Sequence, residues 1–260
     1  MSELSTTVEQ RGAVLHVTMN RLSNRNALDN DMKDALFEAA QRFAGDRELR
    51  CLVITGTGNI FCAGGDLANM MSDRHPLAVR ERVGRTHRLP KLLSNCEKPV
   101  ITAVNGAAVG AGLSLALMGD ICIASSDAFF VSGFPRIGVF PDAGIVYNLP
   151  RAVGLVQAKD ILLTNRRIDA EEALRIGLVS RVLAQDDFAD SVMALAEQVA
   201  AGPTVAFGLA KAMLNHSHRD NIEDFLVKES IAQAVAFGTE DFAEGVQAFK
   251  ERREPKFSGR

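Results

Sequence analysis

Two glycine-rich segments have the residue types that could serve chemistry at a carbonyl group. The first covers residues 61–67 and follows an apolar, strand-like run at 51–55. The second covers residues 105–112, follows another such run at 100–104, and leads into an apolar helical stretch. Glycine lets the backbone approach a ligand closely, and two converging N–H groups stabilise a developing oxyanion. The pattern therefore predicts an oxyanion-binding site.

The same order of strand, glycine turn and helix also occurs at nucleotide sites. A P-loop has two glycines separated by four other residues, followed directly by Lys and then by Ser or Thr. The sequence contains no such run. Gly56 and Gly58 lack the third glycine and the following helix of a dinucleotide-binding fingerprint. The sequence therefore fits neither a P-loop nor a dinucleotide-binding site.

The composition is that of a globular protein and lacks the features of nucleic-acid-binding and membrane proteins. The 260 residues are 47% hydrophobic and 23% charged, which is ordinary for a globular chain. The net charge of −3 gives no electrostatic footprint for nucleic acid. No apolar run approaches the roughly 18 residues of a membrane span, and the first eleven residues are polar. We expect a cytoplasmic protein without a nucleic-acid or membrane partner.

The four cysteines, Cys51, Cys62, Cys96 and Cys122, do not have the spacing of a zinc site. Three of them lie in or beside apolar runs, which favours buried free thiols in a reducing compartment. Cys62 adjoins the first glycine-rich segment, but the sequence places no histidine to activate it as a nucleophile. We expect neither a metal site nor a catalytic thiol.

Strand-like and helix-like patterns alternate over the first ~180 residues, which predicts an α/β fold. From Asp187 onward the pattern is purely helical. We therefore expect an α/β core over residues 1–200 and a helical region over 201–260 that caps the core or serves oligomerisation. Asn30 is expected to cap a helix with an apolar face, and Asp169 to begin another.

Five segments, in order along nearly the whole chain, resemble the crotonase family, the enoyl-CoA hydratase/isomerase superfamily. They are residues 19–21 with 25–28, 61–67, 98–106 with 110–112, 149–151 and 244–249. The resemblance implies a crotonase-like spiral of ββα units with a helical C-terminal region, assembled as a homotrimer or a dimer of trimers. It also implies acyl-CoA thioester substrates. Coenzyme A is then part of the substrate, and no separate cofactor is expected.

The resemblance also assigns site residues. The N–H groups of Ala63 and Ala111 would form the oxyanion hole, and Asp66 would mainly support its turn. Phe249 and Arg252 would reach a neighbouring subunit's coenzyme A, although a solvated basic tail is an equal alternative. The full set of residues expected to contact substrate or coenzyme A is Arg25, Ala27, Ala63, Gly64, Gly65, Asp66, Leu67, Gly110, Ala111, Phe249 and Arg252.

The sequence departs from the family at the two glutamates with which its hydratases position and activate water. Those glutamates would fall at Ser114 and Arg136. Serine is not a general base near neutral pH without an activating partner, and arginine stays protonated. Water addition by the two-glutamate route is therefore disfavoured. Ser114 is expected to pack or to bond back within its helix, and Arg136 to be solvated or ion-paired.

Asp142 lies in the position where the isomerase branches of the family carry their proton-transferring aspartate. Residues 137–144 and 249–260 resemble the branch that converts ring-epoxidised phenylacetyl-CoA to an oxepin. Isomerisation needs one acid/base group, which a single carboxylate supplies. The alternative structural role for Asp142 is to cap a helix beginning near Ala143.

Three functions follow from these features. We expect an enzyme, an acyl-CoA isomerase that acts on an enoyl-CoA or a ring-epoxide thioester through Asp142, with Ala63 and Ala111 as oxyanion donors. A hydratase or hydrolase of the same fold, with water activated by Asp142, is the second. A non-catalytic acyl-CoA-binding protein is the third, and the two intact glycine-rich segments argue against it.

Overall fold

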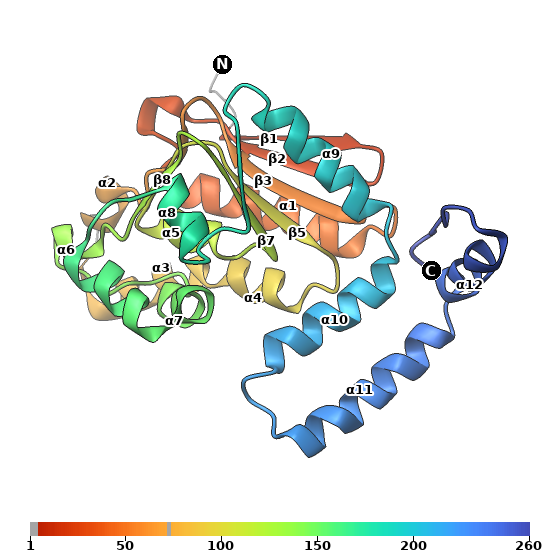
Figure 1. Ribbon diagram of the computed structural model, residues 1–260. Helices are drawn as coiled ribbons and strands as arrows, with labels where there is room; N and C mark the ends of the chain where they lie inside the picture. The colour runs from red at the N-terminus through yellow and green to blue at the C-terminus, as the bar shows by residue number, and fades with distance from the viewer. Residues whose placement is uncertain (1–4, 72–73) are drawn as a thin grey trace.

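The chain folds around two β-sheets (Figure 1). The computed structural model describes residues 5–71 and 74–260. The larger sheet has the order β1-β2-β3-β5-β7-β10; β1 and β2 are antiparallel and the remaining neighbours are parallel. Its strands are β1 (Thr6–Arg11), β2 (Val14–Met19), β3 (Cys51–Gly56), β5 (Val100–Val104), β7 (Ile121–Ser125) and β10 (Arg181–Leu183).

The smaller sheet has the order β4-β6-β8-β9. Its strands are β4 (Ile60–Cys62), β6 (Ala107–Val109), β8 (Phe129–Val131) and β9 (Ile168–Asp169). Strands β4, β6 and β8 are parallel and each follows a strand of the larger sheet after a short turn. This repetition brings the residues after β4 and after β6 to the same edge, where both glycine-rich segments lie.

Helices surround the sheets and fill the second half of the chain. They are α1 (Asn30–Gly45), α2 (Leu67–Met71), α3 (Pro76–Thr86), α4 (Arg88–Asn95), α5 (Ala111–Ala116), α6 (Phe134–Ile137), α7 (Ile145–Thr164), α8 (Ala170–Arg175), α9 (Phe188–Ala200), α10 (Thr204–His216), α11 (Ile222–Phe237) and α12 (Glu240–Glu251). The alternation of strands and helices before residue 184, and helices alone after it, confirms the expected α/β class.

The inner strands of the larger sheet, β3 and β5, are buried on both faces. In β3, Cys51 and Val53 face α9, whereas Leu52 and Ile54 face the core that α1 covers. Successive side chains of a strand point to opposite faces of the sheet. The sequence of a strand that is covered on both faces is therefore a continuous apolar run. The cysteines are free thiols as expected, and burial raises the pKa of the Cys62 thiol to about 12.

Two local expectations need correction. Asp29, not Asn30, caps α1, and its carboxylate accepts the N–H of Met32 at 2.9 Å. From the sequence, Pro76 is expected to open one helix that ends before residues 98–99, whereas the structure divides this stretch at His87 into α3 and α4. The expected cap at Asp169 is confirmed, because its carboxylate accepts the N–H of Glu172 at 2.8 Å.

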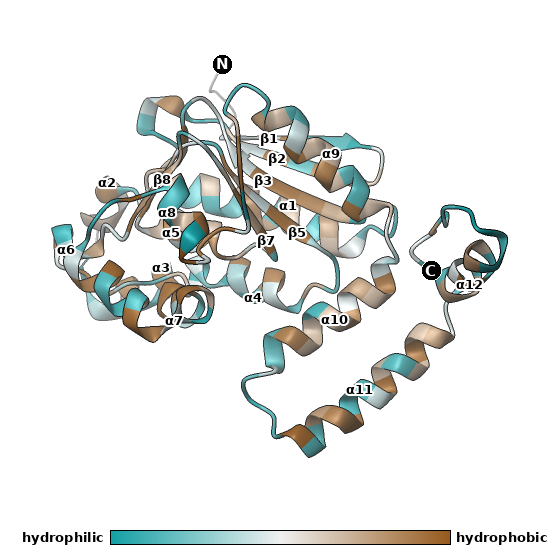
Figure 2. Cartoon of the chain, viewed as in Figure 1, coloured by the Kyte–Doolittle hydropathy of each residue, from teal (hydrophilic) through white to brown (hydrophobic). Residues whose placement is uncertain are grey.

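The C-terminal helices extend away from the sheets (Figure 1). No described residue of α11 is buried, and Figure 2 shows several strongly apolar positions along it.

The division of the chain after residue 200 stays a prediction, and residues 1–4 and 72–73 of the expected core lie outside the described residues. Within the described residues, no single helix is long and apolar enough to cross a membrane; α9 and α10 pass that test only as a pair, bent by 100°.

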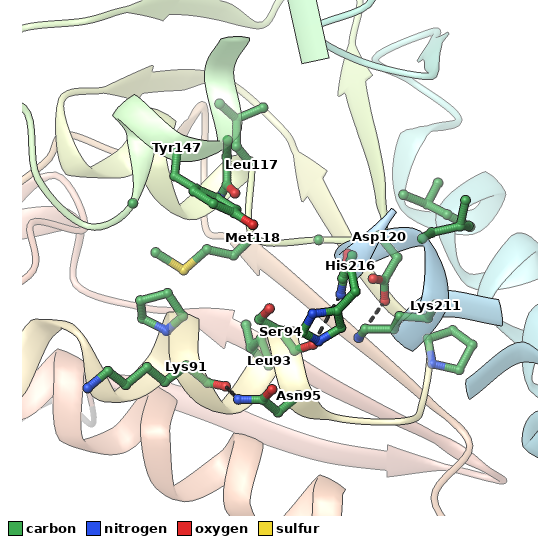
Figure 3. A pocket seen from close by; sticks show the side chains of 18 of the residues that line it. Lys91, Leu93, Ser94, Asn95, Leu117, Met118, Asp120, Tyr147, Lys211 and His216 are labelled. Atoms are coloured by element: carbon green, nitrogen blue, oxygen red, sulfur yellow. Dashed lines mark hydrogen bonds and ion pairs between the residues drawn. The ribbon is translucent and has the colours of Figure 1, made fainter. Parts of the chain in front are cut away.

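An ion pair between the buried Lys211 and the partly exposed Asp120 fixes α10 to the sheet edge (Figure 3). The ammonium of Lys211, only 9% exposed, lies 2.8 Å from an oxygen of Asp120 and donates to the Lys98 carbonyl at 3.0 Å. Asp120 also accepts the N–H of Val100 at 2.8 Å. Burial raises the pKa of the Asp120 carboxyl, and Lys211 opposes that shift. Each partner therefore depends on the other for compensation of its charge.

We predict that Lys211→Met destabilises the fold by about 1–3 kcal/mol at neutral pH, because the Asp120 carboxylate, whose side chain is only 25% exposed, loses its cation. The loss should shrink as pH falls and the Asp120 carboxyl becomes protonated. Urea unfolding at several pH values measures both effects. Lys250→Met, at an exposed position of α12, is the matched control and should stay within about 0.5 kcal/mol of wild type. A similarly small change for Lys211→Met would contradict the prediction.

Candidate active site

The two glycine-rich segments pack backbone against backbone. Gly64 has a φ of +103°, and a Cβ added there would lie 2.8 Å from the carbonyl oxygen of Val109 and 3.5 Å from the nitrogen of Ala111. A Cβ added to Gly112 would lie 2.2 Å from the carbonyl oxygen of Cys62. Neither position has room for a side chain, so glycine is what lets the two turns meet.

A backbone bridge orients the first turn. The N–H of Leu28 donates to the Gly64 carbonyl at 2.7 Å, and the N–H of Asp66 donates to the Leu28 carbonyl at 3.5 Å. Gly65 lies between Gly64 and Asp66, the two residues that are hydrogen-bonded to Leu28. In a parallel bridge, such an intervening residue directs its own N–H away from the bridged strand. No residue in the described ranges accepts the N–H of Gly65.

Ala63 does not offer a free donor, contrary to the expectation from the sequence. Its N–H donates to the Arg25 carbonyl at 3.1 Å. The left-handed Gly64 changes the direction of the chain between the two residues, so that Ala63 faces the Arg25 segment and Gly65 does not. The candidate donor of this turn is therefore Gly65, which the sequence reading had assigned only to substrate binding.

The second turn provides the donor that was expected. Ala111 is the first residue of α5, and Gly110 precedes it with a φ of +56°. The first N–H groups of a helix have no partner within it. Among the described residues none accepts the N–H of Ala111, whereas the N–H of Gly110 is bound to the Val131 carbonyl at 3.0 Å.

Asp142 lies on the segment between α6 and α7. Ala143 and Gly144 follow it with φ values of +54° and +86°, and Gly144 is the N-cap of α7. Only the backbone carbonyl of Asp142 takes part in the helix start, accepting the N–H of Ile145 at 3.3 Å. The carboxylate does not cap α7, so the alternative structural role is wrong.

Ser114 ties this segment to α5. The side chain is buried, and its hydroxyl lies 3.1 Å from the Asp142 carbonyl and 3.4 Å from the Gly110 carbonyl. The contact with Gly110 is the expected bond back within the helix. The contact with Asp142 was not expected, and it places the aspartate backbone beside α5, one helical turn from Ala111.

The carboxylate of Asp142 is partly removed from water. Burial raises the pKa of this carboxyl, while the positive charges of Lys33 and His87 oppose the shift. Lys33 belongs to α1, and His87 lies at the junction of α3 and α4. Arg136, the other position of a hydratase glutamate, is exposed on α6. The site thus combines two unpaired N–H donors with one carboxylate whose pKa is raised.

A groove of about 850 Å³ opens behind this segment, between α4, α7 and α10. Figure 3 shows Tyr147, Leu117 and Met118 on one side and Lys91 to Asn95 of α4 on the other. Gly144 and Asn148 also line it, but Asp142 does not. The groove is therefore adjacent to the candidate site and is not its reacting centre.

The residues expected to contact coenzyme A fall into two groups. The first group lies around the two turns and consists of Arg25, Ala27, Ala63, Gly64, Gly65, Asp66, Leu67, Gly110 and Ala111. Phe249, 86% exposed, and Arg252, at the end of α12, form the second group. Figure 1 shows α12 far from α5 and α6, so one copy of the chain does not bring the second group to the site.

Comparison with known proteins agrees with this arrangement. The family described as "Enoyl-CoA hydratase/isomerase" matches residues 9–260. A "1,2-epoxyphenylacetyl-CoA isomerase" of Escherichia coli is 36% identical over 252 residues, 95% of each chain. A Rhodobacter capsulatus protein named "Probable enoyl-CoA hydratase" is 39% identical over 246 residues, 94% of each chain.

Solved structures share the fold. The crystal structure of an enoyl-CoA hydratase from Bacillus anthracis superposes with a TM-score of 0.93 at 30% identity, covering 98% of this chain and 100% of the other. The crotonase-like fold expected from the sequence is thereby confirmed.

We predict that Ala111→Pro lowers turnover of an acyl-CoA substrate about 10²–10³-fold, because it removes one N–H donor. Proline is well tolerated at the first position of a helix, so the fold should survive. Steady-state kinetics and thermal unfolding measure the two effects. Ala111→Gly keeps the N–H and is the matched control. A folded proline variant with wild-type kinetics would exclude Ala111 as a donor.

Proposed function

Since the chain belongs to the enoyl-CoA hydratase/isomerase family, we propose that it isomerises an acyl-CoA thioester with Asp142 as a single acid/base. The observation that carries the proposal is the half-buried side chain of Asp142, which lies on a segment whose backbone Ser114 fastens to α5. The two positions that hold glutamates in hydratases contain Ser114 and Arg136 instead. One carboxylate suits proton transfer between two carbons better than it suits water activation.

The thioester carbonyl oxygen would accept the N–H groups of Gly65 and Ala111. As a proton leaves a neighbouring carbon, negative charge develops on that oxygen, and each donor lowers the barrier by about 2.7–4 kcal/mol. Asp142 takes this proton and returns it to another carbon of the conjugated system. No atom is gained or lost, and the carboxylate is regenerated.

The surroundings of Asp142 suit this task. A carboxylate with an ordinary pKa is a weak base near neutral pH, and a pKa closer to the working pH makes proton transfer more efficient. Burial moves the pKa of Asp142 in that direction, whereas Lys33 and His87 keep the charged form accessible. The group can then accept and release a proton within one turnover.

Hydration is the second candidate, favoured by the Rhodobacter capsulatus relative that is named as a hydratase. In that case Asp142 would activate a water molecule, and the site would have to hold that water without a second carboxylate. The positions of Ser114 and Arg136 favour isomerisation over this route.

The assembly as a homotrimer or a dimer of trimers stays a prediction, as does the cytoplasmic location. The apolar side chains of α11, including Leu226, Val227 and Ile231, are more than half exposed, which supports contact with another copy. Such a contact would also give Phe249 and Arg252 the neighbouring site that the sequence reading assigns them.

We predict that Asp142→Asn abolishes isomerisation of a 3-enoyl-CoA while leaving affinity for coenzyme A within a few-fold. The wild-type kcat/KM should fall as pH decreases through the raised pKa of Asp142, so the midpoint should lie above the ordinary value of 3.8. Kinetics from pH 4 to pH 8 and calorimetric binding of coenzyme A measure these quantities. Retention of most of the activity in the asparagine variant would rule out the assignment.

We also predict that the wild-type protein hydrates crotonyl-CoA poorly or not at all, because Ser114 and Arg136 replace the paired carboxylates. The loss of absorbance of the conjugated thioester at near-ultraviolet wavelengths measures hydration. Isomerisation of a 3-enoyl-CoA by the same preparation is the positive control. Rapid hydration would show that Asp142 activates water and would favour the hydratase.

A further inference from the structure

Two other stretches of backbone lie against the turn that presents Ala111. A Cβ added to Gly110, the residue before this donor, would lie 3.9 Å from the Cα of Gly64 in the first glycine-rich turn. It would also lie 3.7 Å from the carbonyl oxygen of Ser132, which follows strand β8. The segment after β8 is therefore a second support for the turn, besides the first glycine-rich segment.

The contact between residues 131–133 and the Gly110 turn is close and hydrogen-bonded. The N–H of Gly110 donates to the Val131 carbonyl at 3.0 Å. Gly133 has a φ of +73°, and a Cβ added there would lie 3.1 Å from the Gly110 nitrogen and 3.1 Å from Cγ1 of Val109. The two backbones are thus in direct contact, so the position of the Gly110 turn depends on the position of Gly133.

Asn165 binds this support from a distant part of the sequence. Its side-chain oxygen accepts the N–H of Gly133 at 2.6 Å and the hydroxyl of Ser132 at 3.0 Å. Ser132 is buried and Asn165 is half-buried. One amide oxygen therefore holds the backbone of one residue and the side chain of the other.

The backbone places the Asn165 amide for these bonds. Asn165 follows the last residue of α7 with a left-handed φ of +54°, a conformation in which asparagine is more common than most residues other than glycine. The chain then enters β9, where Ile168 pairs with Phe130 of β8. Asn165 thus lies where the chain returns from α7 to the strand that leads into Ser132 and Gly133.

We propose that Asn165 is a positioning residue for the N–H donor of Ala111. By holding Ser132 and Gly133, its amide keeps the Gly110 turn, and with it the first N–H of α5, directed at the thioester oxygen. The inference rests on the proposed function, because it concerns a donor that the proposed reaction uses. Electrostatic stabilisation depends on donors that are fixed before the reaction, so a looser turn lowers kcat more than it weakens substrate binding.

Kinetics of Asn165→Gly test the proposal. Glycine accepts the left-handed φ but lacks the amide, so the fold should survive. We expect kcat for isomerisation of 3-hexenoyl-CoA to fall about 10-fold, with KM within a few-fold of wild type. Ser132→Ala loses one of the two bonds; it should lower kcat less and provides the same test if the glycine variant does not fold. Unchanged kcat in folded variants overturns the proposal.

A control variant separates positioning from a general loss of stability. Asp169→Ala removes the side-chain cap of α8, close in sequence to Asn165, and leaves the Asn165 amide in place. It should lower the thermal unfolding temperature but keep wild-type kinetics. An equal loss of kcat in Asp169→Ala would show that stability alone explains the effect and would overturn the proposal.

A double-mutant cycle separates an effect on Ala111 from an effect on Asp142. The bond between Asn165 and Gly133 closes the stretch of chain that carries Asp142, so both groups could respond to its loss. In an Ala111→Pro background, Asn165→Gly should cause little further loss of kcat, because the donor that it positions is already removed. Losses that multiply would show that Asn165 acts through another group and would overturn the proposal.

Infrared spectroscopy tests the donor without turnover. Hexanoyl-CoA has no double bond to move, and a difference spectrum with an isotope-labelled thioester carbonyl isolates the C=O stretch of the bound ligand. Hydrogen bonds lower the frequency of that stretch, so it should be higher in Asn165→Gly than in wild type or Asp169→Ala. Equal frequencies in wild type and Asn165→Gly overturn the proposal. If wild type isomerises no enoyl thioester, the proposed function fails, while the carbonyl frequency still decides the role of Asn165.

Discussion

The close contact between two turns without side chains is the constraint on which the site depends. Gly64 and Gly112 let the first turn and the start of α5 approach until a Cβ on either would overlap a carbonyl oxygen. Because the smaller sheet pairs strands β4 and β6 side by side, the turns that follow them cannot separate. Two N–H groups are thereby held in place before any ligand arrives, which is the condition for electrostatic stabilisation of a transition state.

The carboxylate is positioned by a different principle. Asp142 follows no regular element, and its place is set by a left-handed pair of residues and by the Ser114 hydroxyl. Its pKa is then governed by what surrounds it, since burial raises the pKa of the carboxyl and the side chains of Lys33 and His87 lower it. Rigid backbone donors and a carboxylate whose pKa depends on its surroundings are thus supplied by separate parts of the fold.

The sequence predicted the α/β class, most strands, and the two turns, because apolar runs and glycines are local signals. It misplaced one donor: Ala63 and Gly65 lie in the same short motif, and only the φ of Gly64 decides which N–H is free. The contact of Ser114 with Asp142 joins residues 28 positions apart, so no local pattern contains it.

The Ser114 hydroxyl contacts the backbone carbonyls of both Gly110 and Asp142, and this has an evolutionary consequence. At this buried position a glutamate would restore one hydratase carboxylate but would also remove the hydroxyl that fastens the Asp142 segment to α5. One substitution would then weaken the proposed isomerisation before a second carboxylate could complete a hydratase site. Interconversion of the two activities is therefore epistatic: the order of substitutions decides whether an intermediate sequence functions, and routes that first rebuild the segment around Asp142 are the accessible ones.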